Sequence, residues 1–230
     1  MSAATTTGAR SVRVWDLPVR LTHWALVICI VGLYATGEYG WLSMQWHFRF
    51  GYATLALVLF RILWGLVGSE HARFADFVRG PRAIASYLGS WGAHSYRPAL
   101  GHNPLGAVAV LAMLALIFAQ AVSGLFSNDE IEWFGPLSER ISMDASADWT
   151  DWHQLGQKLL LALIVVHLLA VSVYRLVKRE DLVTPMLTGR KLREDGADAV
   201  WRSPWLALPL FLACCAVVWA IALYGPPGAV

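Results

Sequence analysis

Charged residues and cysteines are scarce in this sequence. Charged residues make up 15% of the 230 positions and the net charge is +2, so the charge balance gives no reason to expect nucleic-acid binding. Cys29, Cys214 and Cys215 all lie inside apolar runs, where thiols usually pack as small hydrophobic groups. The motif Cys-x-x-Cys-His is missing, which excludes covalent attachment of a c-type haem. We find no repeats and no low-complexity segments.

Apolar residues are abundant instead. They make up 57% of the sequence, with 12 tryptophans and a mean hydropathy of +0.51, which exceeds the usual range for soluble domains. We therefore predict an all-α integral membrane protein with five transmembrane helices, the last of which carries no histidine and no charge. The five apolar segments, each long enough to span a bilayer, are 21–39, 46–67, 104–126, 151–177 and 204–224.

Loop charge predicts the orientation of these segments. Fourteen of the 18 basic residues lie before the first segment, after the second and after the fourth, and these loops should be cytoplasmic. The loop 127–151 holds seven carboxylates and one arginine and should face outward. We expect a multi-pass membrane protein with a cytoplasmic N-terminus and no cleavable signal peptide.

The remaining segments complete the predicted organisation. Residues 1–12 are expected to form a disordered cytoplasmic tail, 13–178 a helix bundle, 179–203 a cytoplasmic linker and 204–224 the fifth helix. Within the bundle, 71–91 alternates aromatic residues with arginines. This alternation indicates an interfacial helix pair broken at Gly80-Pro81, and an ordinary polar loop is the alternative.

Two histidines of the fourth segment carry most of the functional signal. Fourteen residues separate His153 from His167, which on a helix means a rise of about 21 Å and a return to within about 40° of the starting direction. Depth places His47 beside His153 near the outer surface and His23 beside His167 near the inner surface. Such level pairs suit the axial ligands of two haem b irons, and bis-histidine ligation favours electron transfer over oxygen binding.

Other interpretations of the histidines are weaker. A membrane histidine can be a structural hydrogen-bonding group, but two level pairs on three helices are hard to explain that way. Zinc needs ligands within one shell of about 2 Å bonds, and the histidines of the fourth segment are too far apart for that. His71 and His94 are expected to be solvated in a cytoplasmic loop. His102, before Asn103-Pro104, is expected at a helix entry or against a quinone.

Haem propionates require cationic partners near each membrane surface. Arg20 lies one helical turn before His23, and Arg49 lies two residues after His47, so both are candidate propionate contacts. Arg61 and Lys158 lie inside apolar segments and are weaker candidates. Any of these side chains can instead extend to the lipid headgroups without touching haem.

Several stretches resemble the bacterial cytochrome b561 and nickel–iron hydrogenase b-type cytochrome family. They are 14–24 (VWDLPVRLTHW), 61–68 (RILWGLVG) with 72–74 (ARF), 101–106 (GHNPLG), and the spacing of His153 and His167. The resemblance covers about residues 13–178. It implies a four-helix core that binds two b haems through His23, His47, His153 and His167, and it implies electron exchange with a quinone. It does not name the protein partner.

We compare three candidate functions. The first is transmembrane electron transfer between a quinone and a periplasmic redox partner, which could be a hydrogenase, a dehydrogenase or a c-type cytochrome, docked at the acidic outer loop. The second is a stand-alone superoxide:quinone oxidoreductase, which needs a cationic outer funnel and fits that loop poorly. The third is a haem-free scaffold or transporter, which leaves the paired histidines unexplained. We expect the quinone near His102 and Arg73.

Overall fold

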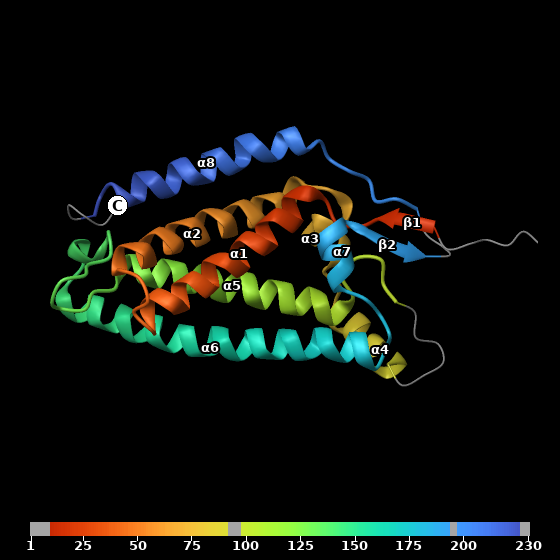
Figure 1. The fold of residues 1–230 in the computed structure, drawn as a ribbon, viewed down its shortest axis with the longest axis horizontal. Helices are drawn as coiled ribbons and strands as arrows, with labels where there is room; N and C mark the ends of the chain where they lie inside the picture. The colour runs from red at the N-terminus through yellow and green to blue at the C-terminus, as the bar shows by residue number, and fades with distance from the viewer. Residues whose placement is uncertain (1–9, 92–97, 194–196, 226–230) are drawn as a thin grey trace, which may run out of the picture.

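Five long helices run side by side along the longest axis of the molecule (Figure 1). The computed structural model describes residues 10–91, 98–193 and 197–225. Each long helix has the length and composition to cross a membrane, so the predicted all-α membrane architecture is confirmed. The five are α1 (Leu17–Gly37), α2 (Met44–Val67), α5 (Pro104–Phe126), α6 (Met143–Leu176) and α8 (Pro204–Ala222).

Local capping explains where these helices begin. The Asp16 carboxylate accepts the Val19 N–H at the start of α1, and the Asn103 side chain accepts the Gly106 N–H at the start of α5. Each of these caps is followed by a proline in the first turn, where a missing N–H costs no hydrogen bond. The start of α5 therefore coincides with the predicted segment.

The helix α6 is longer than the apolar segment that predicted it. Ser142 caps it, so the helix begins eight residues before Asp151. At about 1.5 Å per residue its 34 residues extend about 51 Å, more than a bilayer core of about 30 Å requires. The extra turns carry exposed carboxylates at Asp144, Asp148 and Asp151, whose spacing places them on one helical face.

The long helices pack as two pairs with an outlying fifth. Helix α1 packs on α2, α5 packs on α6, and α2 also contacts α5. Helix α8 lies against α2 on the side away from α6 (Figure 1). Buried side chains from four helices, namely Leu26, Val58, Ile117 and Leu160, form an apolar core cluster between the pairs.

The end of the bundle that contains the start of α1 carries short elements, two of which lie in the predicted linker; residues 1–9 of the predicted tail lie outside the described residues. The short elements are β1 (Arg10–Arg13), η1 (Glu70–Ala72), α3 (Phe74–Phe77), α4 (Pro81–Ser90), α7 (Val183–Thr188) and β2 (Arg190–Arg193). Strands β1 and β2 pair antiparallel, so residues 10–12 belong to a sheet, and 179–203 is not a plain linker. The predicted helix break at Gly80-Pro81 is present, because α4 begins at Pro81.

Burial explains why this small sheet forms. Val12 is fully buried, and the Lys191 ammonium donates to the Glu180 carboxylate at 2.6 Å with both side chains largely buried. Gly189 has a φ of +79°, a conformation that favours glycine, and its carbonyl accepts the Val14 N–H at 2.9 Å. The turn thus ties β2 to the start of α1.

The opposite end of the bundle carries a closed turn and the short helix η2 (Ser138–Arg140). Asn128 and Phe134 form an isolated antiparallel bridge. One oxygen of the Asp129 carboxylate accepts the backbone N–H groups of Ile131, Glu132 and Trp133 at 2.8–3.0 Å. Burial opposes ionisation of Asp129, but these hydrogen bonds outweigh it and hold the pKa of that carboxyl below its usual range.

Candidate functional site

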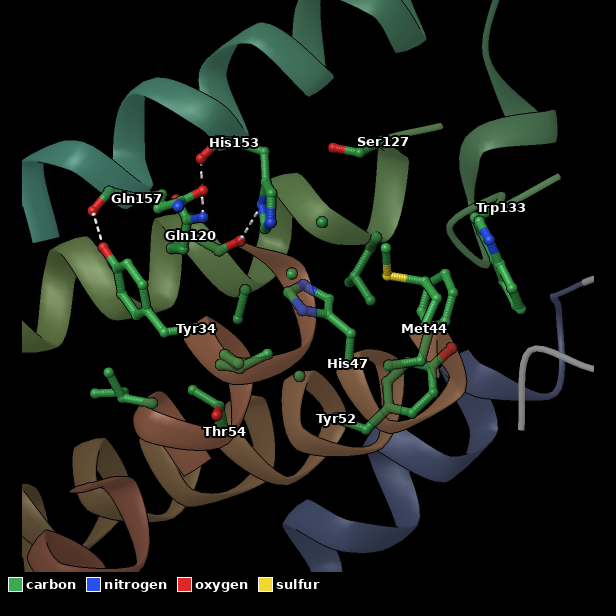
Figure 2. A pocket seen from close by; sticks show the side chains of 18 of the residues that line it. Tyr34, Met44, His47, Tyr52, Thr54, Gln120, Ser127, Trp133, His153 and Gln157 are labelled. Carbon is green, nitrogen blue, oxygen red and sulfur yellow. Dashed lines mark hydrogen bonds between the residues drawn. The ribbon is translucent and has the colours of Figure 1, made fainter. Parts of the chain in front are cut away.

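The outer histidines meet between the two helix pairs. His47 projects from α2 and His153 from α6, with ring centroids 6.2 Å apart and ring planes inclined by 75°. In Figure 2 the two imidazoles point toward one another across a cavity. The structure therefore brings together the two residues that depth alone had paired in the sequence.

Hydrogen bonds hold the His153 ring by its Nδ1 atom. That atom lies 3.0 Å from the backbone carbonyl of Gln120 and 3.0 Å from Oγ of Ser123. A carbonyl only accepts, and the Ser123 hydroxyl donates to the same carbonyl at 2.9 Å, so we assign the ring proton to Nδ1. This tautomer leaves the Nε2 lone pair free, which is the form in which histidine binds a metal.

The His47 ring is held in the same way from α1. The Thr36 hydroxyl lies 2.8 Å from the Gly32 carbonyl, to which it donates, and 3.1 Å from Nδ1 of His47. The hydroxyl oxygen can then accept the Nδ1 proton, so Nε2 is again free. Both outer histidines thus present an unprotonated nitrogen under the control of a hydroxyl on a neighbouring helix, which is the arrangement typical of ligating imidazoles.

The cavity around this pair fits a flat group with polar edges. Its volume is about 220 Å³, and Gly37, Gly51 and Gly124 are part of its wall. A Cβ on Gly51 would meet no atom within 4 Å, whereas one on Gly37 or Gly124 would press on a histidine ring. Two buried polar atoms of the lining, Tyr52 Oη and Gln120 Oε1, have no hydrogen-bond partner within the described residues. The donor set and the unpaired polar atoms fit haem.

The inner histidines lie nearer the opposite end of the bundle. His23 projects from α1 and His167 from α6, close enough to interact electrostatically. The His23 ring stands edge-on to Trp24 at 5.0 Å between centroids, and its Nδ1 atom is buried without a hydrogen-bond partner in the described part of the chain. Both imidazoles can offer nitrogen to an iron, and the unpaired Nδ1 is a polar atom that the surrounding protein leaves unsatisfied.

An apolar layer separates the two levels. Leu26 lies one turn beyond His23 on α1, and Leu160 lies midway between the two histidines of α6. With Val58 and Ile117 they close the space between the two pairs. The molecule therefore has two distinct candidate sites rather than one long channel.

The structure turns Arg49 away from the outer pair. Its guanidinium lies over the Trp46 ring, 4.9 Å from the centroid, and Arg49 faces a groove between α2 and α8. Residues two positions apart on a helix differ by about 200° in direction, so Arg49 projects from the face of α2 opposite to that of His47. The expected contact of Arg49 with an outer propionate is therefore not supported.

The other basic candidates have different surroundings. The Arg20 guanidinium donates to the Leu187 carbonyl in α7, so it ties α1 to the inner-end elements. Arg61 is buried, donates to the Ala72 carbonyl at 3.2 Å and lies over the Phe74 ring. Lys158 is exposed on α6. These contacts give Arg20 and Arg61 structural roles.

The histidines outside the two pairs lie near the inner end. His71 is half-buried, with its ring 6.4 Å from that of Trp15, so the expectation that it is solvated is wrong. His102 lies between Trp15 and Phe77, at 4.6 and 4.3 Å between centroids. Burial, and then the charge of nearby Arg61, lower the pKa of His102 to about 3, so its ring is neutral. His94 falls outside the described residues.

Sequence reasoning missed the residues that orient the outer histidines. Thr36, Gln120 and Ser123 were not singled out, although Gln120 and Ser123 are polar residues one turn apart in an otherwise apolar segment. That spacing was an available signal, since polar groups in a membrane helix are costly unless they have partners. Thr36 gave no such signal, because its contact with the His47 ring depends on how α1 packs against α2.

Comparison with known proteins finds b-type cytochromes. A family model described as prokaryotic cytochrome b561 matches residues 14–189. No solved structure matches the chain. Similar curated proteins include one from Azotobacter vinelandii, 27% identical over 80% of this chain and 90% of its own length, and one from Cupriavidus necator, 27% identical over 79% and 87%. Both carry the name probable Ni/Fe-hydrogenase B-type cytochrome subunit.

A third relative is the probable Ni/Fe-hydrogenase 1 B-type cytochrome subunit of Escherichia coli K12. It is 23% identical over 80% of this chain and 92% of its own length. The matches to these relatives cover most of both sequences, so the similarity is not confined to a single motif.

Proposed function

Because the chain belongs to the prokaryotic cytochrome b561 family, we propose that it carries electrons across the membrane between a quinone and a redox protein at the outer face. In this proposal two haem b groups bind the chain, one held by His47 and His153 and one by His23 and His167. A haem iron with two histidine ligands supplies reversible one-electron transfer and has no open position for oxygen.

The observation that supports the proposal most strongly is the hydrogen bonding of the outer pair. His47 and His153 come from different helices, yet both have Nδ1 engaged and Nε2 free. A histidine that only stabilised packing would need no such common orientation. Thr36 and Ser123 would fix the ring directions, and the unpaired polar atoms of the cavity wall would meet the polar edge of the bound group.

The two ends of the bundle suit different partners. The outer end carries the seven carboxylates of 127–151, so a cationic protein surface would be attracted to it. The relatives' names make a nickel–iron hydrogenase the first partner to test. A dehydrogenase or a c-type cytochrome would likewise need a cationic surface to dock there. This acidic end disfavours the alternative substrate, superoxide, which is an anion.

The quinone is assigned to the inner end. His102 and Arg73 lie there with the short helices that follow α2, within reach of the interface where a quinone headgroup resides. The bias of lysine and arginine toward this end supports a cytoplasmic location for it, with the N-terminus inside and the protein in the bacterial inner membrane.

The proposal is tested by the haem content and the redox behaviour of the purified protein. We expect about two haems b per chain by pyridine haemochrome analysis, low-spin six-coordinate ferric spectra, and reduction of both haems by a quinol analogue. A single haem, a high-spin ferric spectrum, or haems that a quinol leaves oxidised would each contradict it.

A further inference from the structure

An apolar groove lies between α2 and α8 on the side of the bundle away from the outer histidine pair. Its volume is about 420 Å³. The small side chains on both helices leave space there: Ala53 and Ala56 on α2, and Cys215 and Ala222 on α8. Trp219, also part of the wall, is 57% exposed. Tyr52 lines both this groove and the outer cavity, and the other seven residues of the groove wall are not part of the lining of that cavity.

One arginine lines the groove, and a second contacts the chain just after the last lining residue of α8. Arg49 is part of its wall and lies over the Trp46 ring. Arg140 lies over the Tyr224 ring, 5.0 Å from the centroid, and Tyr224 follows Ala222 by two residues. Both arginines are exposed, and neither forms an ion pair within residues 10–91, 98–193 and 197–225. Two cations without carboxylate partners at the mouth of an apolar groove leave a place for an anion.

We propose that the α2–α8 groove binds an anionic phospholipid of the outer leaflet. The phosphodiester lies at Arg49, within the field of Arg140, and one acyl chain runs along Ala53 and Ala56 toward the membrane centre. Arg49 is five residues from the outer end of α2, about 7.5 Å along the helix, which is the depth at which a charged side chain can reach the headgroup level.

The length of the groove favours a lipid over a partner helix. Its α2 wall runs from residue 49 to 56 and its α8 wall from 215 to 222, so each extends about 10.5 Å. One leaflet of hydrocarbon is about 15 Å thick, and a spanning helix would need a contact surface closer to 30 Å. The groove therefore matches a chain confined to one leaflet.

Native mass spectrometry of the purified protein tests this site. The protein would be extracted in mild detergent and exposed to phosphatidylglycerol or to phosphatidylcholine. We expect one tightly retained phosphatidylglycerol. Arg49→Gln should lower its retention about tenfold by removing the charge-assisted contact. Ala53→Phe keeps the charge but fills the groove and should have a similar effect. Lys158→Gln, which removes an exposed cation of α6 outside the groove, is the matched control and should change nothing.

Several outcomes would overturn the proposal. These are equal retention of the two lipids, an equal loss in the Lys158→Gln control, retention unaffected by Ala53→Phe, or a copurified polypeptide that Ala53→Phe displaces. The haem spectrum and the potential of the outer haem should stay unchanged in Arg49→Gln. A shift in either would mean that Arg49 acts at the haem after all. If Arg49→Gln fails to fold, Ala53→Phe with phosphatidylglycerol decides the question.

Discussion

The outer and inner ends of the bundle hold their histidines by different means. At the outer end, hydroxyl and carbonyl groups of α1 and α5 bind the Nδ1 atoms of His47 and His153. At the inner end, Nδ1 of His23 is buried with no hydrogen-bond partner among the residues that the structure describes, and the ring is placed by its contact with Trp24. The outer ring directions are thus set by hydrogen bonds and the inner one by packing.

The surroundings of the two ends differ as well. A closed turn and an acidic helical face lie at the outer end, whereas a sheet, four short helices and most of the basic residues cover the inner end. Hydrogen bonds fix an angle more tightly than apolar contacts do, so the outer site is the better preorganised of the two. We expect it to be the more sensitive to small changes in its lining.

Removal of a ligand should have the largest effect and should separate the two ends. His47→Ala should abolish binding of the outer haem and leave the inner one, so that pyridine haemochrome analysis gives about one haem per chain. His23→Ala should do the converse. Redox titration identifies which haem remains, because the two should differ in potential through their different surroundings.

The apolar layer of Leu26 and Leu160 is the reason to expect independent loss. Loss of both haems in either variant, with the protein still folded by circular dichroism, would show that the sites are coupled. An outer haem disturbed by His23→Ala with the inner one intact would show that the pairing is wrong.

A smaller effect should follow from crowding the outer ring. In Gly37→Ala the added Cβ would lie 2.8 Å from Cε1 of His47, so the imidazole must shift, at a cost of about 1–3 kcal/mol. We expect the outer haem to be retained about tenfold less well and the inner haem to be unaffected. Gly89→Ala on α4, where a Cβ meets nothing within 4 Å, is the control. A normal outer haem spectrum in Gly37→Ala would contradict the claim that the outer site is tightly preorganised.

The smallest effect concerns the acidic outer face. Neutralising Glu130, Glu132, Asp144 and Asp148, with Asp129 kept because it closes the turn, should slow electron exchange with a basic c-type cytochrome about tenfold at low salt. The difference should shrink as salt screens the charges, while haem spectra and quinol reactivity stay the same. Stopped-flow rates that match those of the wild type at low and high salt would exclude this face as the docking surface.

Much of the fold could be predicted because membrane helices depend on local properties. The length of an apolar run and its flanking caps decide whether a helix spans, and α5 begins and ends where its composition changes. The level pairing of His47 with His153 also follows from helix rise alone. The early start of α6 was missed because its first turns are polar and stabilised by the Ser142 cap, which a search for apolar runs passes over.

Contacts between distant segments could not be predicted in the same way. Arg49 was expected near a propionate because it is close to His47 in the chain, but its helical direction turns it toward α8. His71 was expected in solvent, but the packing of the inner end places it beside Trp15. The strand Arg10–Arg13 depends on pairing with residues almost 180 positions away, a distance over which sequence pattern carries no signal.

The sequence by itself determined the five spans, the charge difference between the ends and the two depths at which histidines occur. Each follows from the free energy of placing a residue in hydrocarbon or in water, and that free energy is a local quantity. Only the tertiary structure decided which ring nitrogens are free, at which glycines an added Cβ would press on a histidine ring, and which way each arginine turns. These features depend on the angles between helices that pack against one another, and the sequence of a single segment does not determine those angles.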